Sequence, residues 1–361
     1  MRICCISNMY PSAGEPDYGA FVADMCEALE HRGHRVAIAA IASRATGRVR
    51  TPTKYARLLL DAVRAARGAD VVYAHYLFPT GSIAAIAAAI ARVPWVVTAH
   101  GGDVANLANP GVRRATRLSI ARADTVIAVS RDLVDRMRTA GLTPARIAVV
   151  NMGVDVERFV PADRAAARSR LGLPVGPPLL LAVGGLTDRK QPLELVRAAA
   201  RLLDHHPDLH LAFVGDGPLA DRIAPLAAEL GIPAERIHRP GVVPHAAVAD
   251  WMAAGDVLSM VSRNEPLGVV ALEALASGRP VVATSVGGAA EVVPDRGPGR
   301  IVAPGDTAAH AAALGELLEN PPPVDTARAV AVTHALAHQA ARVEETLQAA
   351  VDRRAAGRVR H

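Results

Sequence analysis

Two glutamates with a glycine between them, Glu265 and Glu273, form the pattern with the clearest chemical meaning in this chain. They follow the apolar run 256–261, which predicts a buried strand, and Glu273 falls in the second turn of a helix predicted over Val269–Ser277. Gly268 stands at the start of that helix, where the missing Cβ lets a ligand approach the backbone. Because a helix start offers unpaired N–H groups and a positive dipole end, it is a ready site for a diphosphate. A carboxylate one turn further along can accept both vicinal hydroxyls of a ribose.

Taken alone, two glutamates at this spacing are also typical of an exposed helical surface, so their context decides. Three other segments of the second half have the same order of strand, polar loop and helix: LLAVGGLTDRKQPLELVRAA (180–199), FVGDGPL (213–219) and RPVVATSVGGAAEVV (279–293). In an open parallel sheet, ligands bind beyond the carboxyl ends of the strands, where these loops meet. Arg189 and Lys190 add positive charge there.

Short apolar runs alternate with helical stretches through the first half of the chain. The predicted strands are Ile3–Ser7, Arg35–Ile41, Asp70–Ala74, Trp95–Ala99, Thr125–Ser130 and Ile147–Asn151. Helical patterns lie between them, for example over Phe21–Arg32 and Ser82–Ala91. Strands that are almost continuously apolar indicate a parallel sheet covered on both faces, and the alternation indicates a doubly wound α/β fold.

The alternation stops at residues 161–178, which are rich in proline, glycine and charge and therefore predict a linker. It then restarts with strands predicted at Leu179–Val183, Leu211–Val214, Arg236–His238, Asp256–Val261, Pro280–Thr284 and Arg300–Val302. We therefore predict two Rossmann-like domains, over 1–165 and 166–340. The remaining stretch, 341–361, predicts a helix that packs back on the first domain.

Composition supports a folded protein with two cores, because half of the 361 residues are apolar. The three cysteines, Cys4, Cys5 and Cys26, are interpreted as buried structural thiols. The start of the chain lacks the features of a secretory signal, and Arg92 and Pro94 interrupt the longest apolar stretch, Ile83–Thr98. A soluble cytoplasmic protein is expected.

Positive charge is concentrated in the first half, where residues 1–160 hold 20 Lys and Arg against 13 Asp and Glu. The excess lies in Arg44, Arg48, Arg50, Lys54, Arg57, Arg64 and Arg67. Two interpretations stay open: an ordinary solvated surface, or a face that binds an acidic acceptor or the inner face of an anionic membrane. Nucleic acid is disfavoured because the basic run contains a single aromatic side chain, Tyr55, rather than an interleaved series.

The motifs of the second half, in their order and spacing, resemble the family 4 glycosyltransferases, which have the two-domain GT-B fold. The resemblance rests on VGGLTDRKQ, VGDGPL, EPLGVVALEALASGRPVVAT and VGGAAEVV. The first half agrees through YPSAGEPDYGAFV, RGHRVAIAA, TAHGGDV and NMGVDVERFVP. The resemblance implies two doubly wound domains that face a cleft. The first domain would bind the acceptor, and the second would bind a nucleotide sugar.

In similar enzymes the glutamate on the helix, here Glu273, holds the donor ribose, and the loop glutamate, here Glu265, lies beside the transferred sugar as a catalytic residue. The resemblance assigns three further groups to the donor: the backbone around Leu267, Gly268 and Val269, the phosphate-binding Lys190, and Gly19 in a first loop that closes over the diphosphate. One departure is Gly185, which stands where the family usually has an arginine. Arg189 is the candidate to supply that missing charge.

His100, in the sequence His-Gly-Gly-Asp after the strand Trp95–Ala99, is the second catalytic candidate. A lone histidine after a strand is often structural, but the resemblance implies that it reaches the sugar or the acceptor. Asp103 is a candidate to orient His100 or to contact the acceptor.

The resemblance implies transfer with retention from a nucleotide-diphosphate sugar, UDP-hexose first, to give an α-glycoside. The chain has no Asp-x-Asp sequence, and Asp155-Val156-Glu157 is only a near miss, so neither a metal nor another cofactor is expected. The acceptor stays open among a sugar, a lipid-linked sugar and a small aglycone. The alternatives are a sugar-nucleotide epimerase, a phosphorylase and a non-catalytic nucleotide-binding relative. A dinucleotide-dependent oxidoreductase is disfavoured because no Gly-x-Gly-x-x-Gly follows the first strand.

Overall fold

The computed structural model describes residues 1–45 and 50–359 of the chain. It divides into two compact units, Met1–Met152 with Leu336–His361, and Gly153–Ala335. Each unit is built around a six-stranded sheet in which every paired strand runs parallel to its neighbour. The predicted α/β class with two doubly wound sheets is therefore confirmed. Among the described residues, none of the helices combines the length and the apolar character that crossing a bilayer would require.

The first unit has the strand order β2-β1-β3-β4-β5-β6. Its strands are β1 (Arg2–Ser7), β2 (Arg35–Ala40), β3 (Val71–His75), β4 (Trp95–Ala99), β5 (Thr125–Ala128) and β6 (Ile147–Val149). Its helices are α1 (Ala20–His31), α2 (Arg50–Ala66), α3 (Thr80–Ala91), α4 (Gly102–Ala105), α5 (Pro110–Ile120), α6 (Arg131–Thr139) and α15 (Leu336–Val359), with a short 3₁₀ helix at Asn106–Ala108.

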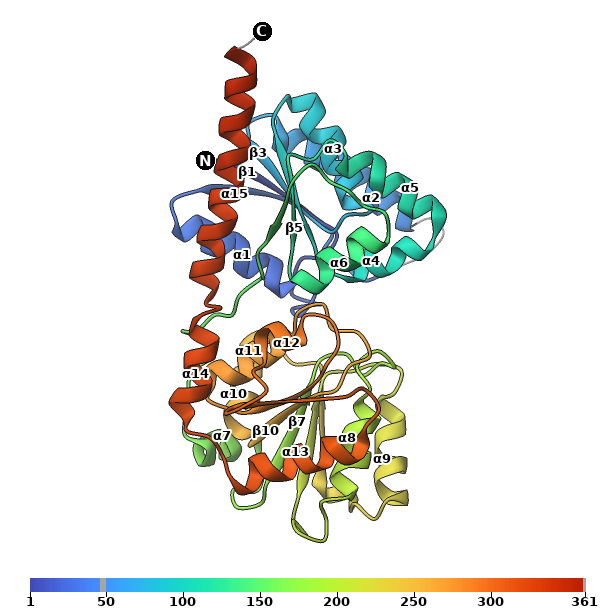
Figure 1. The fold of residues 1–361 in the computed structure, drawn as a ribbon, viewed down its shortest axis with the longest axis vertical. Helices are drawn as coiled ribbons and strands as arrows, with labels where there is room; N and C mark the ends of the chain where they lie inside the picture. The colour runs from blue at the N-terminus through green and yellow to red at the C-terminus, as the bar shows by residue number, and fades with distance from the viewer. Residues whose placement is uncertain (46–49, 360–361) are drawn as a thin grey trace. The chain divides into compact units, whose positions relative to one another are not determined.

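Two groups of helices cover this sheet (Figure 1). Helices α2, α3 and α5 pack side by side on one face, and α1 packs against α15 on the other. The central strands β3 and β4 are fully buried between these layers, which explains why their sequences are almost continuously apolar. The C-terminal helix thus returns to the unit formed by the start of the chain.

The second unit has the strand order β12-β11-β10-β7-β8-β9. Its strands are β7 (Leu179–Val183), β8 (His210–Val214), β9 (Ile237–Gly241), β10 (Val257–Met260), β11 (Val281–Thr284) and β12 (Gly299–Val302). Its helices are α7 (Arg164–Leu171), α8 (Pro192–Ala200), α9 (Ala220–Glu229), α10 (His245–Ala254), α11 (Val269–Ala276), α12 (Ala289–Val292), α13 (Thr307–Glu319) and α14 (Val324–Val332), with a short 3₁₀ helix at Ala234–Arg236.

Helices α8, α9 and α13 form one layer of this unit, and α7, α10, α11 and α14 form the other (Figure 1). A hydrophobic core fills the space between β7, β8 and the first layer, and the completely buried Phe213 belongs to it. Apolar burial of this extent is the principal driving force for folding.

The predicted linker at 161–178 is wrong, because this segment contains the helix α7. Asp163 caps the first turn by accepting from the amides of Ala165 and Ala166, and Gly172 ends the helix in the left-handed region at φ 68°. Arg168 on this helix is completely buried and pairs with Asp256 at 2.7 Å. The division between the compact units lies at residues 152 and 153, before the expected boundary at 165.

Each sheet reverses its strand order at one point, which is where open α/β sheets bind ligands. In the second unit the reversal lies between β7 and β10, and in the first unit between β1 and β3. The loops that follow these four strands carry most of the residues singled out in the sequence.

Candidate active site

The loops after β7 and β10 bring Lys190 and Glu265 together in the second unit. The Lys190 Nζ lies 2.5 Å from Oε2 of Glu265, and the Ser262 hydroxyl donates to the same oxygen at 3.2 Å. Glu265 is only 5% exposed, so the partners that satisfy its carboxylate matter energetically. A pocket beside this pair is lined by Gly184, Gly185, Leu186, Lys190, Met260 and Ser262. Two residues that lie 75 positions apart in the sequence thus form one charged centre at the reversal point.

The glycines of the motifs are required by close contacts between loop backbones. A Cβ on Gly215 would lie 2.1 Å from the carbonyl oxygen of Gly184, and one on Gly217 would lie 2.5 Å from that of Leu186. A Cβ on Gly287 would lie 2.0 Å from the carbonyl oxygen of Glu265. Since all three contacts are with backbone, side-chain rearrangement would not relieve them.

Gly268 precedes α11 with φ 98°, and a Cβ there would also meet the Met260 Cε at 2.9 Å. Leu267, before it, is 4% exposed and anchors the loop in the core. Val269 begins the helix, so the amides around it include the first N–H groups of α11, which have no acceptor within the helix. This helix start has the donor groups that a diphosphate needs.

Glu273 lies in α11 and is 7% exposed, so it is not the solvated surface charge that its spacing alone would permit. Its Oε1 lies 2.8 Å from Nε2 of His245, at the start of α10. Sequence reasoning did not identify His245, although it follows a strand in the same way as the predicted site residues.

Arg189 and Gly185 stand at the edge of this site. The Arg189 side chain is exposed, and its carbonyl oxygen accepts from the amide of Arg263 at 2.8 Å. A Cβ on Gly185 would make only ordinary contacts, at 3.8 Å with Thr187 and 4.0 Å with Asp216. The backbone therefore leaves room for a side chain at 185, and the absence of an arginine there has no steric cause.

In the first unit, His100 follows β4 and its ring pairs with that of His75 at the end of β3. The His100 Nε2 lies 3.0 Å from Nδ1 of His75, and the two rings stack with centroids 5.2 Å apart. Burial lowers the pKa of His75 to about 3. Burial, with a smaller contribution from His75, places the pKa of His100 well below its ordinary value. Both rings are therefore neutral at physiological pH, and His100 is suited to hydrogen bonding rather than to ion pairing.

Asp103 holds the turn that carries His100. Its carboxylate accepts from four backbone amides: those of Leu77 (2.8 Å), Gly101 (2.9 Å), Val104 (3.0 Å) and His100 (3.2 Å). Burial raises the pKa of Asp103 and outweighs these four hydrogen bonds, which lower it. Asp103 is 2% exposed, and this contact orients His100 through its backbone.

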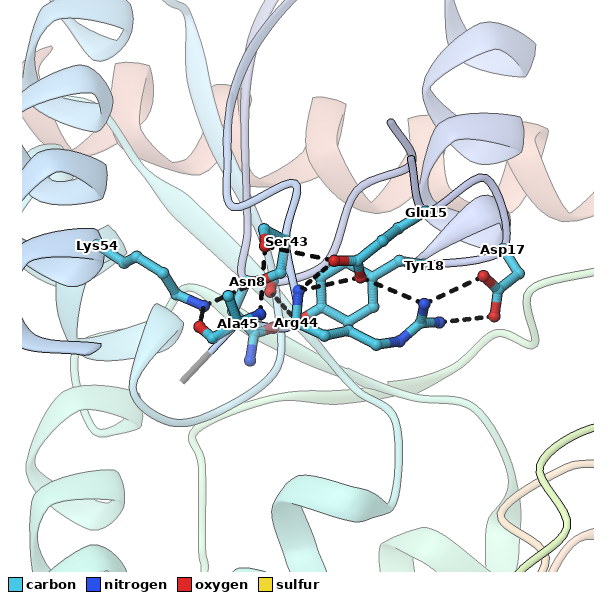
Figure 2. A network of polar contacts seen from close by, with 8 residues as sticks. All are labelled: Asn8, Glu15, Asp17, Tyr18, Ser43, Arg44, Ala45 and Lys54. Carbon is cyan, nitrogen blue, oxygen red and sulfur yellow. Dashed lines mark hydrogen bonds and ion pairs between the residues drawn. The ribbon is translucent and has the colours of Figure 1, made fainter. Parts of the chain in front are cut away.

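Gly19 caps α1 with φ 79°, and a Cβ there would lie 2.6 Å from the Met9 carbonyl carbon. The loop before it is held by Arg44, as Figure 2 shows. The Arg44 guanidinium pairs with both oxygens of Asp17 at 3.1 and 2.6 Å, contacts Glu15 at 3.3 Å, and lies 4.6 Å from the centre of the Tyr18 ring. Arg44 is thus neutralised locally and is not a free charge of the basic run.

Other members of that basic run are also occupied. The Lys54 Nζ donates to the carbonyl oxygens of Ser43 and Ala45, and Arg57 and Arg64 both lie within 4 Å of Asp61. Arg48 lies outside the described residues. In the described part of the basic run, Arg44, Arg57 and Arg64 therefore have acidic partners, whereas the carbonyl oxygens around Lys54 leave its charge uncompensated.

Comparisons with known proteins show which family the chain resembles. A family model described as glycosyl transferases group 1 matches residues 163–331, and one described as glycosyltransferase family 4 matches residues 19–158. The D-inositol 3-phosphate glycosyltransferase 1 of Catenulispora acidiphila is 37% identical over 295 residues, which cover 76% of this chain and 69% of that protein. The D-inositol 3-phosphate glycosyltransferase of Thermobispora bispora is 36% identical over 308 residues, with 79% and 71% covered.

Among solved structures, HepE of Anabaena in complex with UDP-glucose has a TM-score of 0.78 to this chain, with 23% identity. The superposition covers 97% of this chain and 100% of HepE. At this level of identity the likeness concerns the fold.

Proposed function

The chain belongs to the family 4 glycosyltransferases and is a glycosyltransferase with the GT-B fold; from this premise we propose that it moves a hexosyl unit from a nucleotide-diphosphate sugar, UDP-linked first, to a hydroxyl acceptor. The donor binds at the reversal point of the second sheet. Transfer retains the anomeric configuration and needs no metal. The alternatives are an epimerase, a phosphorylase and a non-catalytic nucleotide-binding protein. The experiment below distinguishes each of them from a glycosyltransferase.

The observation that carries this proposal is the ion pair between Lys190 and the buried Glu265 beside the start of α11. Lys190 and the first amides of α11 supply the positive field that stabilises a diphosphate leaving group as the glycosidic bond breaks. Glu265 lies beside the transferred sugar, and Glu273 accepts hydrogen bonds from the ribose. Arg189, exposed near Lys190, supplies a second positive charge.

Metal independence is part of this proposal and rests on the positively charged groups of the site. The charge that a divalent cation would bring to the diphosphate is instead assigned to Lys190, Arg189 and the helix start.

Retention is proposed to proceed by attack from the face that the leaving group occupies, with the β-phosphate taking the acceptor proton. A double displacement would require a carboxylate nucleophile paired with a carboxylic acid across the scissile bond. Glu265 is already engaged by Lys190 and Ser262, which disfavours it as a free nucleophile. His100, neutral and fixed by Asp103 and His75, is assigned to hydroxyl groups of the sugar or acceptor.

The acceptor is a sugar, a lipid-linked sugar or a small aglycone that offers a hydroxyl group. Two relatives more than a third identical are named for transfer to D-inositol 3-phosphate, so this cyclitol phosphate is the first acceptor to test. A peripheral contact with an anionic membrane is supported by α5, where Arg113, Arg114 and Arg117 are exposed and Leu118 is 64% exposed. Co-sedimentation with vesicles containing anionic lipid tests this contact.

The function is tested with a thermal-shift panel of UDP-, GDP-, dTDP- and ADP-sugars in the presence of EDTA, followed by transfer assays with the sugar that stabilises the protein. A ligand that binds only the native state raises the melting temperature. An α-configured product in the proton NMR spectrum supports the proposal. A β-product, turnover without an acceptor, or dependence on inorganic phosphate would each contradict it.

A further inference from the structure

The motif Gly-Val-Asp-Val-Glu-Arg-Phe at residues 153–159 has no part in the function as described above, yet it lies in the second unit. Arg328 on α14 fixes this segment against α11. Its guanidinium donates to three carbonyl oxygens, those of Val156 (3.0 Å), Phe159 (3.2 Å) and Ala276 (3.0 Å). Ala276 is the last residue of α11, so the segment is held to the helix that carries Glu273.

Arg158 and His245 connect this segment to Glu273. The Arg158 Nη1 lies 3.0 Å from Nδ1 of His245, and Nε2 of the same imidazole lies 2.8 Å from Oε1 of Glu273. The Phe159 ring packs against the imidazole with centroids 5.6 Å apart. One histidine therefore bridges an arginine and a nearly buried carboxylate, with one ring nitrogen facing each.

The direction of these hydrogen bonds follows from the chemistry of the three groups. Arginine has only donors, so His245 Nδ1 must accept and carries no proton. The ring proton then lies on Nε2 and is donated to the Glu273 carboxylate. Asp155 holds Arg158 in place through both oxygens of its carboxylate. Its Oδ1 accepts from the amides of Glu157 and Arg158 at 3.0 Å each, and its Oδ2 lies 3.4 Å from the Arg158 guanidinium.

We propose that Arg158 and His245 are positioning residues that present the Glu273 carboxylate to the ribose of the donor nucleotide. The inference rests on the proposed function, in which Glu273 accepts the vicinal ribose hydroxyls. His245 occupies Oε1 and sets the plane of the carboxylate, and Oε2 is directed to the ribose. Arg158 fixes the tautomer, because the opposite tautomer would point a bare Nε2 lone pair at the carboxylate.

Calorimetric titration of the 361-residue chain with UDP and with 2′-deoxy-UDP tests this inference. GDP and 2′-deoxy-GDP are used instead if the guanine nucleotide is the one that binds. The variants are His245→Ala, His245→Gln and Glu273→Gln, and Gln at 245 retains an N–H donor. The matched control is His238→Ala, because His238 on the edge strand β9 also pairs with a neighbouring ring, that of His210 on β8, at 2.9 Å.

In His245→Ala, we expect affinity for the ribonucleotide to fall about tenfold and affinity for the 2′-deoxynucleotide to fall clearly less. The preference for the ribonucleotide therefore shrinks, while His245→Gln restores much of it and His238→Ala leaves it intact. Equal losses for both nucleotides in His245→Ala would overturn the inference while leaving Glu273 as the ribose ligand. If Glu273→Gln retained the full preference, or if no nucleoside diphosphate bound the wild type, the proposed function itself would fail.

Ring-nitrogen NMR of His245 provides a readout that a merely structural role would not move. The proton is expected on Nε2 in the wild type, and in Arg158→Ala the signals should shift toward a mixture of tautomers with partial loss of ribonucleotide preference. A proton found on Nδ1 in the wild type would overturn the assigned direction of the hydrogen bonds and with it the inference.

Discussion

Replacing Gly287 with alanine should damage the site through a single backbone contact. Gly287 has φ 59°, and a Cβ there would lie 2.0 Å from the carbonyl oxygen of Glu265. The same oxygen accepts from the amide of Gly288 at 2.9 Å, so the strand-to-helix loop after β11 is fitted against the loop that carries Glu265. Neither partner is a flexible side chain, and one of the two loops must move.

The cost has three parts. Holding a non-glycine residue in the left-handed region costs about 1 kcal/mol. Loss of the Gly288 hydrogen bond costs about another 1 kcal/mol, and displacing the packed backbone adds on the order of 1–3 kcal/mol. We therefore expect Gly287→Ala to lower the free energy of unfolding by about 3–5 kcal/mol. Because Glu265 moves with its carbonyl, the affinity for the nucleotide sugar should fall as well.

Gly231→Ala is the matched control, since Gly231 has φ 77° and a Cβ there would meet nothing within 4 Å. It should lose only about 1 kcal/mol and bind the donor normally. Denaturant unfolding monitored by circular dichroism measures the stabilities, and calorimetry measures donor binding. If Gly287→Ala lost no more stability than Gly231→Ala and bound the donor equally well, the reasoning about this contact would be refuted.

Four further predictions concern three residues of the candidate site and one buried histidine, His310, on α13. Glu273→Ala should weaken nucleotide binding by about 1.5–3 kcal/mol in calorimetry, and an unchanged Kd would remove Glu273 from the ribose. His100→Ala should reduce kcat far more than donor affinity; equal losses in both would make His100 structural. Gly185→Arg should fold normally, since a Cβ at this position would contact only Thr187 and Asp216 at 3.8 Å or more. The added positive charge should tighten diphosphate binding, and weaker binding would contradict this. Burial lowers the pKa of His310 to about 4, whereas an unfolded histidine has a pKa of about 6.5. Between these two values the unfolded chain binds a proton that the folded chain does not. The free energy of unfolding therefore falls by about 1.4 kcal/mol for each pH unit below about 6.5 because of this histidine. Between pH 6 and 5, the free energy of unfolding of His310→Asn should therefore fall less steeply with pH than that of the wild type. Equal slopes for the two proteins would contradict this.

Most of the strands in the described residues were predictable because they are apolar and buried, whereas β2, β6 and β9 are only partly buried. Most predicted strand ends lie within two residues of the observed ones. The helix α7 was missed because proline and glycine surround it. Its local signals, Asp163 and Gly172, were present, but its stability depends on the distant Asp256 that pairs with the buried Arg168. Local propensity does not reveal a partner 88 residues away.

Candidate site residues could be named from the sequence where they follow strands within recognisable motifs, as Lys190, Glu265 and His100 do. Their partners in the structure could not, because the contacts depend on strand order. His75 meets His100 only because β3 and β4 are neighbours, and His245 meets Glu273 through the packing of α10 on α11. A search for polar residues after every strand would have found both histidines without assigning their partners.

The donor site is proposed to lie at the reversal point of the second sheet. A crystal structure of the protein with UDP, or with the nucleotide that gives the largest thermal shift, should be determined from crystals grown in EDTA. We expect the diphosphate within hydrogen-bond distance of the Lys190 Nζ and the first amides of α11, with the ribose hydroxyls on Glu273 and no metal on the phosphates. A nucleotide bound elsewhere in the chain, or one held through a metal ion, would contradict it.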